Sequence, residues 1–141
     1  MYECIVAAYD GSDGARSALR RAAEIAGRDG ASLTVVESVP ESLPALVPGA
    51  PKPAEHRGAA EARTELREAV AALDPALEAS PWAVGGPAGK AIVTVAEDLG
   101  ADLIVCGSRN KGRLERAVLG SVATEVLHAA HCDVLVVQPA D

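Results

Sequence analysis

The chain has 141 residues, the length of one ordinary domain, and 49% of them are hydrophobic, so it can bury a sizeable core. A formal net charge of −7 argues against general binding to nucleic acid, which requires a broad basic face. No apolar run approaches the roughly 20 residues of a membrane span, and the N-terminus has no signal-peptide pattern, so we expect a cytoplasmic protein without a membrane partner.

The first third of the chain predicts a strand, a helix and a second strand. Residues 3–9 are apolar and typical of a buried strand, and residues 10–13 have turn chemistry, with Ser12 or Asp13 available as a helix N-cap. Alanine and leucine then recur at helical spacing up to Gly27, with Gly30 as a second stop signal. Residues 32–39 form the second predicted strand.

Five of the nine prolines lie between Pro40 and Pro53, a stretch too rich in proline for a helix or a central strand. We interpret it as a long loop, a mobile flap near the ligand end of the sheet. A helical stripe follows from Ala59 to Leu73, and Asp74-Pro75 ends it.

The second half of the chain repeats the alternation of strand and helix. Strands are predicted at 80–84, 102–106 and 133–137, and helices from Pro87 to Gly100 and from Ser121 to about Ala130. The strands are apolar throughout, which is typical of a parallel sheet covered on both faces. We therefore predict one α/β domain over residues 1–141, a Rossmann-like, doubly wound, five-stranded parallel sheet of order 3-2-1-4-5 with helices on both faces.

Aromatic residues are scarce, so the core must rely on Val, Leu, Ile and Ala. The three are Tyr2, Tyr9 and Trp82, and we expect Trp82 to lie in the core. The three cysteines lie in or beside apolar runs, which is typical of buried, reduced thiols.

A basic loop between Gly107 and Ser121 indicates an anion site. It follows a predicted strand, precedes a predicted helix, and contains four cations in an otherwise acidic chain, namely Arg109, Lys111, Arg113 and Arg116. Glycine lets a backbone approach a ligand closely, and the N–H groups and dipole of the next helix favour negative charge. Arg109 and Lys111, nearer the strand, are the better candidates for contacting phosphate.

The predicted strand order brings distant loops together. Strands one and four are neighbours where the order reverses, and ligands bind at such points, at the carboxyl ends of the strands. Asp10 should therefore face Gly107 across a crevice, with the end of the second strand, residues 37–39, on the same rim.

Three segments resemble the universal stress protein family, and the likeness covers essentially the whole chain. They run over residues 5–12, 101–108 and 119–137. The family's nucleotide signature is Gly, two residues, Gly, nine residues, then Gly-Ser or Gly-Thr, and here Gly107, Gly120 and Ser121 occupy their positions. Asn110 replaces the second glycine; asparagine tolerates left-handed backbone better than most residues but adds bulk.

The resemblance implies an ATP pocket. Asp10 would hold the ribose, the backbone around Ser38 the adenine, and the signature residues the phosphates. The candidate nucleotide-binding residues are Ala8, Tyr9, Asp10, Ser38, Cys106, Gly107, Arg109, Asn110, Lys111, Gly120, Ser121 and Val122. Asp10, Asp13 or Glu37 could reach a phosphate-bound Mg²⁺. The resemblance also implies a homodimer paired edge to edge through the last strand.

Other chemistry is less well supported. His128, His131 and Cys132 could suggest a metal site, but the run fits a helix end whose dipole favours histidine better. The sequence contains no Walker A lysine motif and no evident Ser–His–acid or Cys–His arrangement. We expect a regulatory protein that hydrolyses ATP slowly at most and acts on an unidentified protein partner; the alternatives are a nucleotide-free dimeric scaffold and a phosphoester hydrolase.

Overall fold

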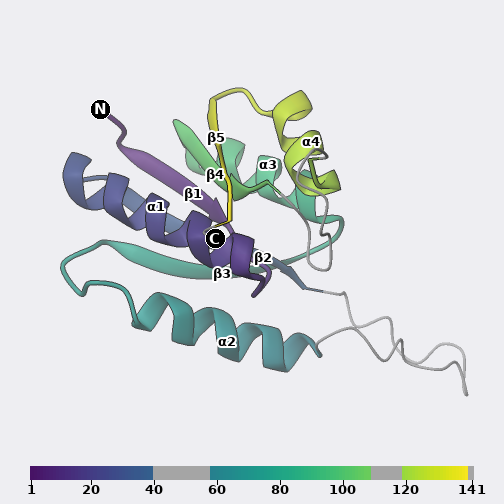
Figure 1. Ribbon diagram of the computed structural model, residues 1–141, viewed down its shortest axis with the longest axis horizontal. Helices are drawn as coiled ribbons and strands as arrows, with labels where there is room; N and C mark the ends of the chain where they lie inside the picture. The colour runs from purple at the N-terminus through teal and green to yellow at the C-terminus, as the bar shows by residue number, and fades with distance from the viewer. Residues whose placement is uncertain (40–57, 109–118, 140–141) are drawn as a thin grey trace, which may run out of the picture.

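The computed structural model describes residues 1–39, 58–108 and 119–139. The elements are β1 (Cys4–Ala8), α1 (Asp13–Asp29), β2 (Ser32–Val39), α2 (Ala59–Ala71), β3 (Ala79–Gly85), α3 (Ala88–Leu99), β4 (Leu103–Gly107), α4 (Ser121–Ala129) and β5 (Asp133–Val137) (Figure 1). Every predicted strand and helix is present, with ends shifted by a few residues. The proline-rich stretch and the four cations of the basic loop lie outside the described residues.

The strands form one parallel sheet of order β3-β2-β1-β4-β5, which confirms the predicted fold. Strand β1 lies in the centre, with Ile5 paired to Leu33 of β2 on one side and to Leu103 of β4 on the other. The order therefore reverses between β1 and β4, and the two edges are β3 and β5.

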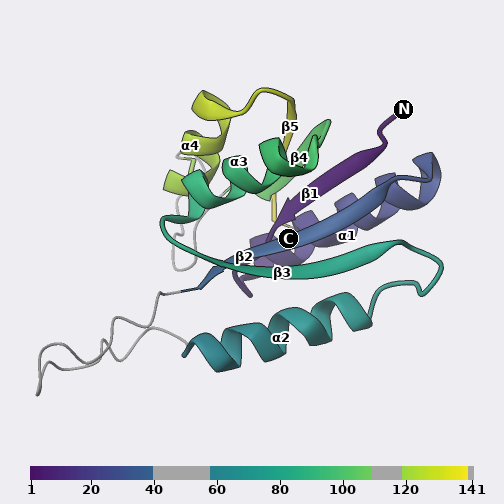
Figure 2. The same ribbon diagram turned by 180° about the vertical axis from the view of Figure 1, so that it is seen from behind.

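Two helices cover each face of the sheet (Figures 1 and 2). Helices α1 and α2 pack on the face that presents Ile5, Leu33 and Val35. Helices α3 and α4 pack on the face that presents the alternating residues, among them Val6 and Ile104. The central strands β1 and β4 are buried on both faces, as their uninterrupted apolar sequences predict.

The ends of α1 follow local chemistry. Ser12 is its N-cap, and its side chain accepts a hydrogen bond from the Ala15 N–H group. The helix passes through Gly27, the first predicted stop, and ends at Gly30, whose φ of 70° suits a residue without a side chain. With 17 residues it is longer than the other described helices, and none of them is long and apolar enough to cross a membrane.

The prediction that Trp82 lies in the core was wrong, because 40% of the residue is exposed. Trp82 is on the edge strand β3, paired with Val36 of β2. Alternation places both side chains on the α3 side of the sheet, but α3 contacts β1 and β2. The outer part of that face, where Trp82 lies, is therefore open to solvent.

Candidate functional site

A crevice lies at the carboxyl ends of β1 and β4, where the strand order reverses. It encloses about 480 Å³, a figure that includes the solvent-filled space at its open mouth. The residues that line it come from four strand ends or turns and from three helices. They are Ala8, Tyr9, Asp10, Ser12, Ala15, Ser38, Ala88, Ile92, Cys106, Gly107 and Val122.

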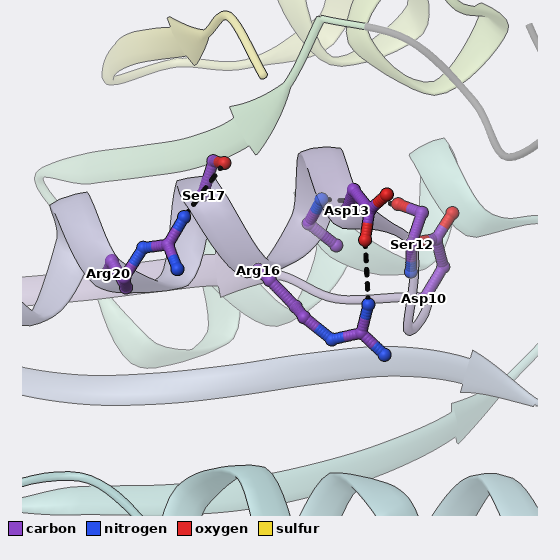
Figure 3. A network of polar contacts seen from close by, with 7 residues as sticks. Asp10, Ser12, Asp13, Arg16, Ser17 and Arg20 are labelled. Carbon is purple, nitrogen blue, oxygen red and sulfur yellow. Dashed lines mark hydrogen bonds and ion pairs between the residues drawn. The ribbon is translucent and has the colours of Figure 1, made fainter. Parts of the chain in front are cut away.

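The turn between β1 and α1 holds Asp10 at this crevice. The Asp10 carboxylate accepts a hydrogen bond from the Ser12 N–H group at 2.9 Å, and Gly11 between them has a φ of 80°. Ser12 in turn caps α1, with 3.1 Å between its Oγ and the Ala15 nitrogen. Figure 3 shows Asp10 and Ser12 together in this turn. The position of Asp10 is therefore set by the chain that starts α1.

Asp13 belongs to the surface of α1. Its carboxylate forms an ion pair with Arg16 at 2.9 Å, and its side chain is almost fully exposed (Figure 3). Asp13 does not line the crevice, although the sequence allowed it to reach a phosphate-bound Mg²⁺.

Gly107 lies where β4 passes the first turn of α1. A Cβ atom placed on it would lie 3.1 Å from both the carbonyl carbon and the oxygen of Gly14, which belong to the backbone and would have to shift by a few tenths of an ångström. The φ of Gly107 is not in the left-handed region. This glycine therefore favours the close approach of β4 to α1 beside the crevice.

Ser38 joins the end of β2 to the start of α3. Its hydroxyl donates a hydrogen bond to the Gly86 carbonyl, just before the N-cap residue Pro87. The first two turns of α3 then supply Ala88 and Ile92 to the crevice. The wall beside Ser38 is therefore aliphatic.

Cys106 supplies a neutral part of the wall. It is almost completely buried, and this burial raises the pKa of its thiol to about 11. The thiol is protonated near neutral pH and is a poor nucleophile there. Its role at the crevice is that of a small apolar side chain.

The N-terminus of α4 closes the other side. Gly120 is its N-cap residue, with a φ of −64°, and its N–H group donates to the Ser108 carbonyl at 2.8 Å. Val122, in the first turn, lines the crevice. Gly120 and Ser121 precede it directly but are not among the lining residues.

The structure thus brings together seven of the twelve predicted site residues, namely Ala8, Tyr9, Asp10, Ser38, Cys106, Gly107 and Val122. The predictions for Arg109, Asn110 and Lys111 lie outside the described residues. Sequence reasoning missed four lining residues, Ser12, Ala15, Ala88 and Ile92. The sequence could have predicted them, because α1 and α3 directly follow β1 and β3 and so begin at this end of the sheet.

Glu37 lies on the other face of the sheet. Alternation along β2 places it with Leu33 and Val35, on the side of α1 and α2, whereas Ser38 faces the crevice. Only 3% of Glu37 is exposed. The structure therefore does not support the expectation that Glu37 reaches a ligand-bound Mg²⁺.

Within the described residues, no group of three or more His, Cys, Asp or Glu side chains is arranged to hold a metal ion. Among the described residues that line the crevice, Asp10 is the one carboxylate. His131, from the predicted His-x-x-His-Cys run, lies 3.8 Å from the Glu97 carboxylate, beyond the far end of α3.

Comparisons with known proteins agree on one family. The model of the universal stress protein family matches residues 1–138. A universal stress protein of Methanocaldococcus jannaschii is 39% identical over 149 aligned residues, which cover 98% of this chain and 83% of the relative.

Two solved structures carry adenine nucleotides. A universal stress protein in complex with cAMP has a TM-score of 0.71 and 29% identity, with 99% of this chain and 98% of that one covered. A universal stress protein from Archaeoglobus fulgidus in complex with dAMP has a TM-score of 0.69 and 28% identity, with 96% and 97% covered.

Proposed function

The chain belongs to the universal stress protein family, and from this premise we propose that it binds ATP, or a related adenine nucleotide, in the crevice between β1 and β4. The observation that carries the proposal is the lining itself, in which strand ends distant in sequence meet the N-terminal turns of three helices at the reversal of strand order. Family members of similar fold bind cAMP and dAMP.

Each part of the crevice suits one part of a nucleotide. The aliphatic wall formed by Ala88 and Ile92 suits the base, which then forms hydrogen bonds with the backbone near Ser38. Asp10 suits the ribose hydroxyls, because a carboxylate accepts two hydrogen bonds. The phosphates belong at the N-terminus of α4, where the first-turn N–H groups, that of Val122 among them, point out of the helix.

Magnesium fits this arrangement only when it is coordinated by the nucleotide phosphates. Asp10 is the one carboxylate among the described lining residues, and a single carboxylate does not hold Mg²⁺ without phosphate or water ligands. A bound Mg²⁺ would lessen the repulsion between Asp10 and the phosphates. We propose no catalytic residue, and expect turnover of ATP to be slow at most.

The first test is the thermal stability of the purified protein with and without Mg-ATP. A ligand present at about 100 times its dissociation constant stabilises the folded state by about 2.7 kcal/mol, which raises Tm by several degrees for a domain of this size. ATP, AMP, cAMP and dAMP are compared in parallel, and the nucleotide released on denaturation is identified by chromatography. No shift with any of them and no released nucleotide would support a nucleotide-free scaffold instead.

A pair of substitutions at Val122 tests the placement of the phosphates. Val122→Asp and Val122→Asn have nearly the same size and remove the same valine, but only the first adds a negative charge beside the bound phosphates. We expect Val122→Asp to weaken ATP binding about tenfold more than Val122→Asn, an energy difference of about 1.4 kcal/mol. Calorimetric titration measures both; equal losses would place the phosphates elsewhere.

We propose further that ATP occupancy changes how the protein meets a protein partner, and that two chains pair through β5. No strand in the described part of the chain pairs with the outer edge of β5, and its residues from Val134 to Val137 are only half-buried. Equal affinity for an isolated partner with and without ATP would remove the regulatory part of this proposal.

A further inference from the structure

A second hollow lies at the opposite end of the sheet from the nucleotide crevice. It is bounded by the C-terminal half of α3, the start of β4 and the connection from α4 to β5. It encloses about 580 Å³, measured in the same way as the crevice, for which the value is about 480 Å³.

The walls of this second hollow are apolar. They are formed by Val93, Ala96, Ala101, Ile104, Ala130 and Cys132. Ile104 and Ala96 belong to the buried core on this face of the sheet, so the floor is fixed by packing. Such a surface favours a short aliphatic chain or a single ring over a sugar or a phosphate.

Two polar side chains at the hollow interact with each other. Glu97, near the end of α3, and His131, in the α4–β5 connection, lie 3.8 Å apart; the His131 side chain is largely exposed and that of Glu97 is half exposed. Glu97 can therefore meet the polar end of a ligand whose apolar end lies on Ile104.

The electrostatic surroundings favour a cation. Asp102 and Asp133 directly follow the lining residues Ala101 and Cys132. Partial burial raises the pKa of Asp102, but hydrogen bonds from the N–H groups of Cys4 and Glu3 outweigh it, so the net pKa is lowered and the group is charged. Helices α3 and α4 also both end here, with the negative ends of their dipoles.

The thiol of Cys132 responds to these surroundings. Burial raises its pKa, and the negative charges of Asp133 and Asp102 raise it further. Asp133 and Asp102 disfavour the thiolate because it is negatively charged. The same two charges would repel an anionic ligand and attract a cationic one.

We propose that this second hollow is a binding site for a small molecule with an apolar body and an ammonium head. The apolar body would lie against Ala96, Ile104 and Ala130, and the ammonium group would pair with Glu97. The site is separate from the nucleotide crevice and does not depend on the proposed function.

The test compares three probes of equal chain length, namely hexylammonium, hexanol and hexanoate, on the full chain. Calorimetric titration gives the affinity, and the rate at which iodoacetamide labels Cys132, read by mass spectrometry, reports on the site. We expect hexylammonium to bind most tightly and to slow labelling of Cys132, with hexanol weaker and hexanoate without effect.

Matched variants test the two halves of the site. Glu97→Gln should weaken hexylammonium about two- to fivefold, the usual effect of one exposed ion pair, whereas Asp98→Asn, the neighbour that does not line the hollow, should not. Ala130→Leu should fill the hollow and abolish protection of Cys132, whereas Ala129→Leu should leave it unchanged. Failure of hexylammonium to bind, equal binding of hexanoate, or equal effects of the two leucine variants would overturn the proposal.

Discussion

Gly107 shows how one residue can serve packing and a binding site together. Gly107→Ala would place a methyl group 3.1 Å from the Gly14 backbone, so α1 and β4 must separate. We expect a loss of about 1–3 kcal/mol in the free energy of unfolding, as for other overpacked sites. Urea denaturation measures it.

The matched control for Gly107→Ala is Gly27→Ala. Gly27 lies inside α1, and an added Cβ would meet Leu77 at an ordinary 3.6 Å. Alanine is the better helix former, so this variant should gain about 0.5–1 kcal/mol. A Gly107→Ala variant as stable as the wild type would mean that the close approach does not constrain the fold.

Cys106 should make stability fall at alkaline pH. In the unfolded chain its thiol ionises near the ordinary cysteine pKa of 9.0, whereas burial holds the folded pKa at about 11. Between these values the unfolded state loses a proton that the folded state keeps, so stability falls by about 1.4 kcal/mol per pH unit. Urea titrations of wild type and Cys106→Val from pH 8 to about 11 should differ in slope; equal slopes would contradict the shift.

Prediction of single site residues succeeded where the strand order alone places a residue at the crevice. It failed where a shift of one position along a strand moves a side chain to the other face of the sheet. Asp10 lies just after β1 and Gly107 is the last residue of β4, so the sheet order alone predicted that they would meet. Glu37 and Ser38 are neighbours, but alternation sends them to opposite faces. Because apolar residues occupy consecutive positions in β2, its sequence does not show whether the odd- or the even-numbered residues face α1 and α2.

At the scale of elements, the N-cap of α1 links stability to the site. Ser12→Ala removes the acceptor for the Ala15 N–H group and should cost about 1 kcal/mol, equivalent to a few degrees in Tm. Ser12→Asn keeps a side-chain oxygen at the cap and should retain most of the stability. Urea denaturation compares the two, and an equal loss in both would mean that the cap contributes little.

Strand and helix positions could be predicted because each has its own period and its own stop signals, as at Gly30 and Gly100. The exposure of β3 could not be predicted. The predicted order put β3 at an edge, but the sequence around Trp82 does not show that α3 is displaced toward β1 and β2 and leaves this side chain uncovered. Helix placement over a sheet depends on tertiary packing rather than on the strand's own sequence.

At the scale of the whole molecule, β5 leaves one edge of the sheet open. Within β5, the Val137 carbonyl accepts a hydrogen bond from the Ser108 N–H group at 3.0 Å, so the backbone groups of Val137 face β4. Adjacent residues of a strand direct these groups to opposite edges, so the N–H group of Val136 faces outward. An edge-to-edge dimer would use this N–H group.

Val136→Pro therefore tests pairing at the outer edge of β5 without disturbing the pairing of β5 with β4. It removes the outward N–H group and leaves the hydrogen bonds to β4, because proline is tolerated on an edge strand where its missing N–H would face solvent. Val136→Ala keeps the N–H group and loses more of the same side chain, so it controls for the apolar contact on the α3 and α4 face. If the chain pairs through β5, sedimentation should show a dimer for wild type and Val136→Ala and a shift to monomer for Val136→Pro, provided that circular dichroism shows all three folded. A folded Val136→Pro variant that remains dimeric would place the interface elsewhere, since no edge-to-edge ladder could then retain that bond.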